Sequence, residues 1–109
     1  MKKYLVVYKA DPEAFAKVVA SMTPESREAS MKEWGAWMES HKANIADMGA
    51  PVGKTKQVTK EGVSDIKNDI GGYGIIQAET HDAAAQILAD SPHFSRINGS
   101  VEVMEIMEM

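Results

Sequence analysis

The stretch KYLVVYK, residues 3–9, is the most informative segment of this sequence. It is rich in β-branched and aromatic residues and ends just before Asp11-Pro12, which is typical of a β-strand. Side chains alternate along a strand, so its apolar residues divide between two faces: Tyr4, Val6 and Tyr8 on one, Leu5 and Val7 on the other. Because both faces are apolar, we predict a central strand that is covered on both sides. Helices can cover one face, and we expect a second copy of the chain to cover the other.

Two helix starts follow this strand. Asp11 is a good N-cap before Pro12, and Thr23-Pro24 repeats the signal. The spacing predicts a short helix over residues 12–21 and a long helix from Pro24 to about Met48, with Gly49 in the position that ends it. The long helix is expected to bury one stripe: Met31, Trp34, Met38, His41, Ile45 and Met48.

After the long helix, the pattern predicts a polar edge strand over residues 52–60, a loop over 61–70 and a strand over 73–78. It then predicts a helix over residues 81–90 and a last strand over 101–107. The order βαββαβ indicates an α+β, ferredoxin-like fold with a four-stranded antiparallel sheet. Right-handed crossovers place strands 3–9 and 73–78 in the middle of that sheet.

Length and composition narrow the function classes. The chain has 109 residues, so we expect one domain over residues 1–109, and its net charge of −4 argues against nucleic-acid binding. The absence of cysteine excludes disulfides, thiolate chemistry and cysteine-ligated zinc.

No segment approaches about 18 consecutive apolar residues, so no membrane span is expected. The N-terminal apolar run stops at Lys9, too early for a signal peptide, and a cytoplasmic location is the expectation.

Seven short stretches, taken in their order, carry a family resemblance: KYLVVY (3–8), WGAW (34–37), DMGAPVGK (47–54), GVSD (62–65), GYGIIQA (72–78), SPHF (91–94) and SVEV (100–103). On these stretches the chain resembles the YCII-related family of the dimeric α+β barrel superfamily. The resemblance implies two chains packed sheet on sheet, with a cleft between each sheet and its helices or loops. One branch of the family carries an Asp-Gly-Pro-Phe loop where this chain has Ser64-Asp65-Ile66-Lys67. The His-Asp pair proposed as catalytic in the better-known branch has no clear match here, since Met38 falls near the position of that His.

Two histidines are candidate catalytic residues. His93 follows Pro92 in a loop before the last strand, where an imidazole can act as a general acid or base. The alternative is that His93 binds backbone carbonyls and holds the loop. His41 lies on the apolar stripe of the long helix, where it is either functional or a boundary histidine with one satisfied nitrogen.

Four other residues are candidate ligand-binding residues. Trp34 and Trp37 are spaced to border one groove, as a flat wall for a ring or as apolar anchors. Tyr73 can direct its hydroxyl into the same space or pack in the sheet. Lys54 can neutralise an acidic ligand or protect an exposed strand edge.

The histidine spacing matches no metal site, and we expect neither a metal nor a cofactor. Three functions stay open: a lyase- or isomerase-type enzyme that uses His93 on a small organic acid or ring-derived substrate, a non-catalytic small-molecule-binding protein, and a structural homodimer.

Overall fold

The structure, a computed structural model, describes residues 1–95 and 98–107. Its elements, in chain order, are β1 (Lys2–Lys9), α1 (Pro12–Ser21), α2 (Pro24–Ser40), β2 (Ile45–Pro51), β3 (Thr55–Thr59), β4 (Gly62–Ile66), β5 (Ile70–Ala78), α3 (His81–Ala89), the 3-10 turn η1 (Pro92–Ser95) and β6 (Ser100–Glu105). The predicted α+β class is confirmed. The predicted N-caps are confirmed as well, since Asp11 accepts from the Ala14 amide and Thr23 from the Ser26 amide.

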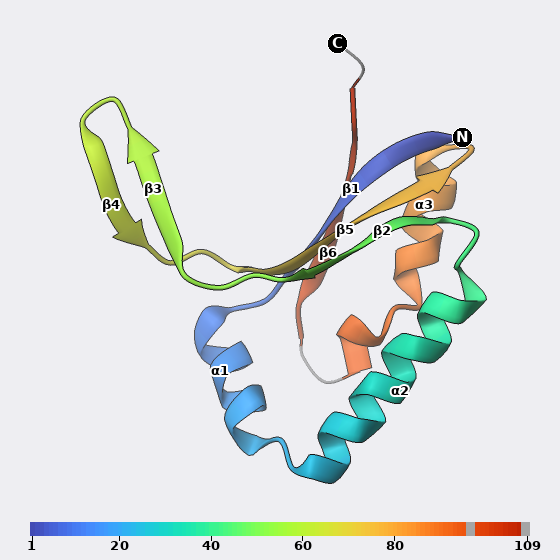
Figure 1. The fold of residues 1–109 in the computed structure, drawn as a ribbon, viewed down its shortest axis with the longest axis horizontal. Helices are drawn as coiled ribbons and strands as arrows, with labels where there is room; N and C mark the ends of the chain where they lie inside the picture. The colour runs from blue at the N-terminus through green and yellow to red at the C-terminus, as the bar shows by residue number, and fades with distance from the viewer. Residues whose placement is uncertain (96–97, 108–109) are drawn as a thin grey trace.

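The main sheet has the antiparallel strand order β2-β5-β1-β6. Strand β1 pairs with β5 on one side and β6 on the other, so its predicted central position is confirmed. All helices lie on one side of this sheet, and the opposite side has no helix over it in the described part of the chain (Figure 1). The sheet therefore has a covered face and an open face.

The core lies between the covered face and helices α2 and α3. Its buried members are Tyr4, Val6, Trp37, Ile76, Ala78, Ala84 and Leu88. Tyr4 and Val6 lie on the same face of β1 as Tyr8, as predicted, and Ala84 and Leu88 are the buried residues of α3. Removing such side chains from water is the main stabilising contribution to a small domain.

The predicted long helix is wrong beyond Ser40. The backbone leaves the helix at His41, and Ile45–Pro51 forms the edge strand β2 instead of the last helical turns. Pairing with β5 satisfies the backbone of this segment and outweighs its helix-like apolar spacing. Gly49 has a positive φ of 68° in a bulge of β2, not at a helix end. Met31 and Met48, expected to be buried, are exposed.

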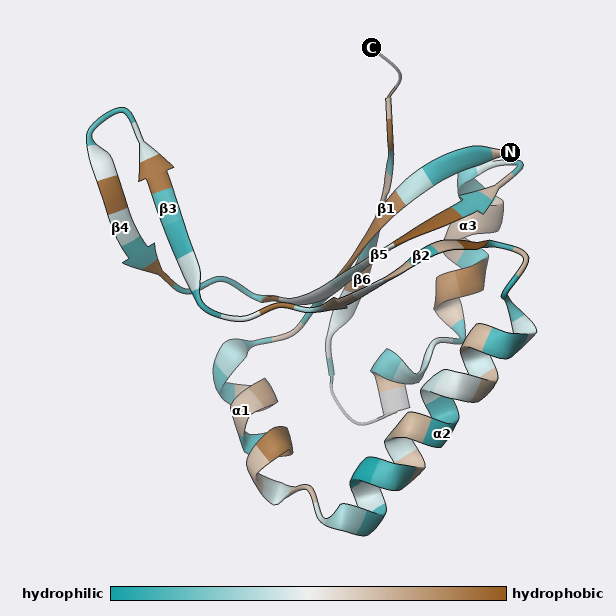
Figure 2. Ribbon diagram, in the orientation of Figure 1, coloured by the Kyte–Doolittle hydropathy of each residue, from teal (hydrophilic) through white to brown (hydrophobic). Residues whose placement is uncertain are grey.

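The predicted loop over residues 61–70 is also wrong in part, because Gly62–Ile66 forms β4. It pairs only with β3 in a separate two-stranded hairpin that extends away from the main sheet, on the side opposite the helices (Figure 1). Figure 2 shows an apolar segment on each hairpin strand; Val58 pairs with Val63, and both are exposed. None of the helices in the described residues is long and apolar enough to cross a bilayer.

Candidate functional site

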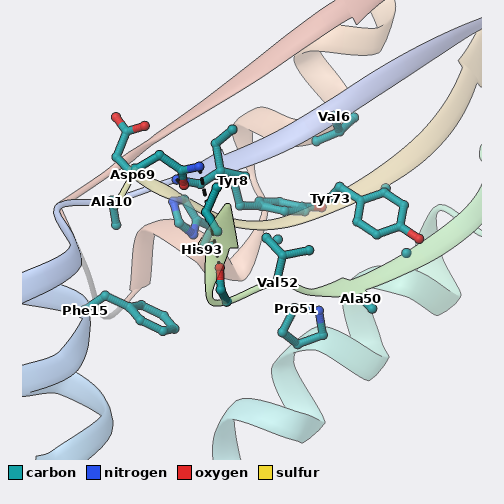
Figure 3. A pocket seen from close by; sticks show the side chains of 18 of the residues that line it. Val6, Tyr8, Ala10, Phe15, Ala50, Pro51, Val52, Asp69, Tyr73 and His93 are labelled. Atoms are coloured by element: carbon teal, nitrogen blue, oxygen red, sulfur yellow. Dashed lines mark hydrogen bonds between the residues drawn. The ribbon is translucent and has the colours of Figure 1, made fainter. Parts of the chain in front are cut away.

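A cleft of about 1440 Å³ lies between the covered face of the sheet, helices α1 and α2, and the base of the hairpin. Its inner wall includes Val6 and Tyr8 of β1, Trp34 and Trp37 of α2, and His93 of η1. Phe15 of α1 faces them from the other side (Figure 3). Apolar and aromatic groups with a few polar ones are the usual lining of a small-molecule site.

Two glycines of β5 keep the floor of this cleft open. Gly72 and Gly74 alternate with Tyr73 and lie on the covered face, where Gly72 is directly opposite Tyr8. A Cβ added to Gly72 would lie 3.6 Å from Cδ2 of Tyr8, an ordinary contact, and 3.5 Å from the Ala50 carbonyl oxygen. Larger side chains at these positions would occupy the space beside the Tyr8 ring.

The position of His93 is compatible with both roles left open by the sequence, as a general acid or base and as a residue that holds the loop by binding a backbone carbonyl. Its half-buried ring lines the cleft beside Tyr8, with the ring centroids 5.5 Å apart, and its Nε2 lies 3.0 Å from the Lys9 carbonyl oxygen. Because a carbonyl can only accept, Nε2 carries the hydrogen of the neutral ring and Nδ1 keeps a free lone pair. Nδ1 has no partner among residues 1–95 and 98–107. A backbone carbonyl that fixes the tautomer in this way leaves a nitrogen that can act as a base.

Gly99 makes this arrangement possible. A Cβ there would overlap the Lys9 carbonyl oxygen and would lie 2.9 Å from Nε2 of His93. The glycine thus lets the chain before β6 pass over the hydrogen bond.

Aromatic rings continue from His93 along the cleft wall. Tyr8 makes an edge contact with Trp34 at 5.4 Å, and Trp34 makes another with Trp37 at 5.8 Å. Trp37 is also a core residue: it is 7% exposed, and its Nε1 donates to the Ile87 carbonyl oxygen and to Asp90. Both tryptophans therefore border one groove, and Trp37 anchors the helix at the same time.

Charged side chains gather at the hairpin end of the cleft. Lys54 and Lys67 line it and have no carboxylate partner in the described part of the chain. Lys56 is paired with Asp65 at 2.7 Å, and Asp69 with Lys9 at 3.5 Å. The unpaired lysines give this end a positive charge that suits an anionic group.

Two predicted site residues lie elsewhere. His41 caps α2, and its Nε2 is 3.4 Å from Oδ1 of Asp90, outside the cleft. Tyr73 borders the cleft through its strand, but it is opposite Val7 in the ladder and so its ring shares the open face. The described residues contain no group of three His, Asp or Glu side chains that could hold a metal ion.

The model of the YCII-related domain matches residues 2–109. The chain belongs to the YCII-related family. No curated protein is similar enough in sequence to count as a match. Among solved structures, the chain is similar to the 5-chloro-2-hydroxyhydroquinone dehydrochlorinase TftG of Burkholderia phenoliruptrix AC1100 in its complex with 2,5-dihydroxybenzoquinone. The TM-score is 0.57 at 18% identity, and the match covers 98% of this chain and 95% of that one. This likeness supports the α+β barrel type of fold.

Tyr8 lines the cleft of this YCII-related protein but was not among the site residues predicted from the sequence. Its position in a central strand indicated a core residue, and its ring does pack beside Trp34. The sequence feature that could have indicated this role is the pair Gly72 and Gly74. Because β5 has no side chains at these two positions on the covered face, space is left beside Tyr8 of β1. Burial raises the pKa of the Tyr8 hydroxyl from 10.0 to about 12, so this hydroxyl stays protonated at neutral pH.

The raised pKa of Tyr8 predicts a loss of stability in alkaline solution. Unfolded Tyr8 ionises near pH 10.0 and folded Tyr8 only near 12, so between these values the unfolded chain binds fewer protons and the free energy of unfolding falls as pH rises. Lys9, whose pKa is raised by its hydrogen bond to Glu102 and by the charge of Asp69, acts in the same direction. Tyr8→Phe should remove the tyrosine part, measured as a shallower pH dependence of urea unfolding above pH 10. An unchanged slope would contradict this assignment.

Proposed function

We propose that the cleft binds a small, ring-derived organic acid and that His93 moves a proton on the bound ring, as a lyase- or isomerase-type enzyme requires. The observation that carries the proposal is the position of His93: an imidazole with a fixed tautomer, whose Nδ1 has no partner in the described part of the chain, beside aromatic rings that line one cleft. General acid–base chemistry needs a group whose pKa is near the working pH, and imidazole is the ordinary one.

The aromatic and charged residues that line the cleft indicate the class of ligand. Tyr8, Trp34 and Phe15 offer flat apolar surfaces to a ring, while Lys54 and Lys67 supply positive charge at one end. The fold neighbour is a dehydrochlorinase in complex with a dihydroxybenzoquinone, which is a planar ring with acidic oxygens. The same chemical class fits the walls of this cleft.

The test uses 2,5-dihydroxybenzoquinone as a probe in two measurements. Binding is followed by calorimetry, and proton movement is followed by NMR as exchange of the ring hydrogens for deuterium. In this exchange a proton adds to a ring carbon to give the keto tautomer and the original hydrogen then leaves, so no other reactant is needed. We expect saturable binding and an exchange rate above that of the probe alone. Binding without faster exchange would favour the non-catalytic binding protein instead.

Replacing Gly72 should close the cleft in steps. Gly72→Ala adds a Cβ at ordinary contact distances of 3.5 to 3.8 Å and should leave probe binding nearly unchanged. Gly72→Val adds two further methyl groups beside the Tyr8 ring and should weaken binding by at least about tenfold, while its β-branched side chain suits a strand. Calorimetric titration of the two variants measures the difference. Equal affinity of both variants would place the ligand elsewhere.

We also propose that a second copy of the chain covers the open face of the sheet. The ladder places a group of apolar residues on that face, Leu5, Val7, Tyr73, Ile75 and Met104, next to the polar residues Lys3, Lys9, Gln77 and Glu102. A contiguous apolar surface of this kind is typical of an interface. A cytoplasmic location stays a prediction of the sequence.

The homodimer predicts a mass twice the 11.9 kDa of one chain in light scattering after gel filtration. Ile75→Lys puts a charge on the open face and should give the single-chain mass at micromolar concentration, because an unpaired charge is costly to bury. Val58→Lys, on the exposed hairpin, is the matched control and should keep the double mass. A single-chain mass for the unmodified protein would overturn the proposal.

A further inference from the structure

Tyr8 lines the cleft, and its hydroxyl makes no hydrogen bond within the described part of the chain. The ring contacts Trp34, with the ring centroids 5.4 Å apart, and His93, with the centroids 5.5 Å apart. Figure 3 shows Tyr8 and His93 together in the cleft. In the described part of the chain the one fully enclosed side-chain oxygen or nitrogen without a partner is Ser91 Oγ. The Tyr8 hydroxyl therefore opens onto the cleft and not onto a sealed void.

Two other donors on the cleft wall are already engaged. The Nε2–H of His93 is bound to the Lys9 carbonyl, and the Nε1–H of Trp37 is shared by Ile87 and Asp90. A phenol that keeps its hydrogen donates to an acceptor in the ligand, and the bond is strongest when that acceptor is an anion. The raised pKa of Tyr8 means that a ligand oxygen would ionise long before this hydroxyl does.

We propose that the Tyr8 hydroxyl donates a hydrogen bond to an ionised ring oxygen, so that the cleft selects phenolate- or enolate-type ligands over their neutral forms. The inference rests on the proposed function in that the cleft must bind a ring. With His93 beside Tyr8, one group would hold the charge on the oxygen while the other moves the proton at carbon.

Nearby charges agree with this assignment. The carboxylates that line the cleft have partners: Asp69 shares Lys9 with Glu102, Asp65 pairs with Lys56, and Asp47 accepts from the Gly49 amide. Lys54 and Lys67 add positive charge at the hairpin end. An anion in the cleft therefore meets a donor and cations rather than free carboxylates.

The test uses 4-nitrophenol, whose absorbance reports its own ionisation. The unmodified protein should bind the phenolate at least about tenfold more tightly than the phenol, which lowers the apparent pKa of the bound probe by about one unit or more. Tyr8→Phe should remove most of this preference while the neutral probe still binds. Tyr4→Phe makes the same change at a buried residue of the same strand that does not line the cleft, and it should keep the preference. Unfolding midpoints establish that all variants are folded.

His93→Gln separates this inference from the proposed function. If the variant keeps the phenolate preference, as we expect, the preference does not come from a protonated imidazole. A preference that persists in Tyr8→Phe, or equal binding of both forms by the unmodified protein, overturns the role of Tyr8 and leaves the proton transfer by His93 standing. Failure of the unmodified protein to bind either form overturns the ligand site, and the role of Tyr8 with it.

Discussion

His93→Gln should lower the rate of ring-proton exchange by about 10²- to 10⁴-fold, the usual contribution of a general acid or base. The glutamine amide can reach the position of Nε2 and donate to the Lys9 carbonyl, as the imidazole does at 3.0 Å. The variant therefore removes the titratable nitrogen and keeps the structural hydrogen bond. The exchange is measured by NMR on the bound probe, and the free energy of unfolding by urea titration.

His93→Ala completes the comparison. It leaves the Lys9 carbonyl without its donor and should cost about 1–3 kcal/mol of stability, whereas His93→Gln should stay close to the unmodified protein. If His93→Gln retains full exchange and only His93→Ala is destabilised, the histidine holds the loop and has no chemical role.

Trp37→Ala should destabilise the protein by about 3–5 kcal/mol, a large share of the about 5–15 kcal/mol that stabilises a typical domain. Trp37 is the buried anchor of α2, and its indole joins the helix to Ile87 and Asp90 of the α3 region. The substitution leaves a cavity in the core and removes both hydrogen bonds. It also takes away the ring against which Trp34 packs in the cleft.

Met31→Ala is the matched control, because Met31 lies on the same helix and is 75% exposed. Its effect should stay within about 0.5 kcal/mol, as for most surface positions. A cost below about 1 kcal/mol for Trp37→Ala, measured by urea unfolding, would show that α2 is not anchored through this residue.

The central strands were predictable because local pattern and tertiary environment agree there. Strand β1 is apolar on both faces and pairs on both edges. The segment after His41 could not be placed correctly, because its helix-like spacing conflicts with pairing to β5, and that pairing is a long-range contact. The hairpin strand β4 was missed for a similar reason: its turn residues indicated a loop, and only its partner β3 makes it a strand.

The candidate site was predictable in its aromatic and imidazole parts. Trp34, Trp37 and His93 do meet in one cleft with Lys54. His41 was predicted to lie on the apolar face of the long helix. Because α2 ends at Ser40, that face does not continue to His41. Tyr8 was missed because its exposure to the cleft depends on glycines of a different strand, which no local pattern of β1 reveals.

The two sides of the cleft differ in how firmly they are held. Strands β1 and β5 are fixed by continuous backbone ladders, but α1 contains no buried residue, and Phe15, which faces the cleft, is 44% exposed. Swinging α1 outward would take no apolar side chain out of a packed core, so this movement costs little free energy. The cleft thus has one rigid wall, formed by β1 and β5, and one deformable wall, formed by α1. The rigid wall fixes the positions of the residues proposed to act on the ligand, and the deformable wall can adapt to ligands of different shape.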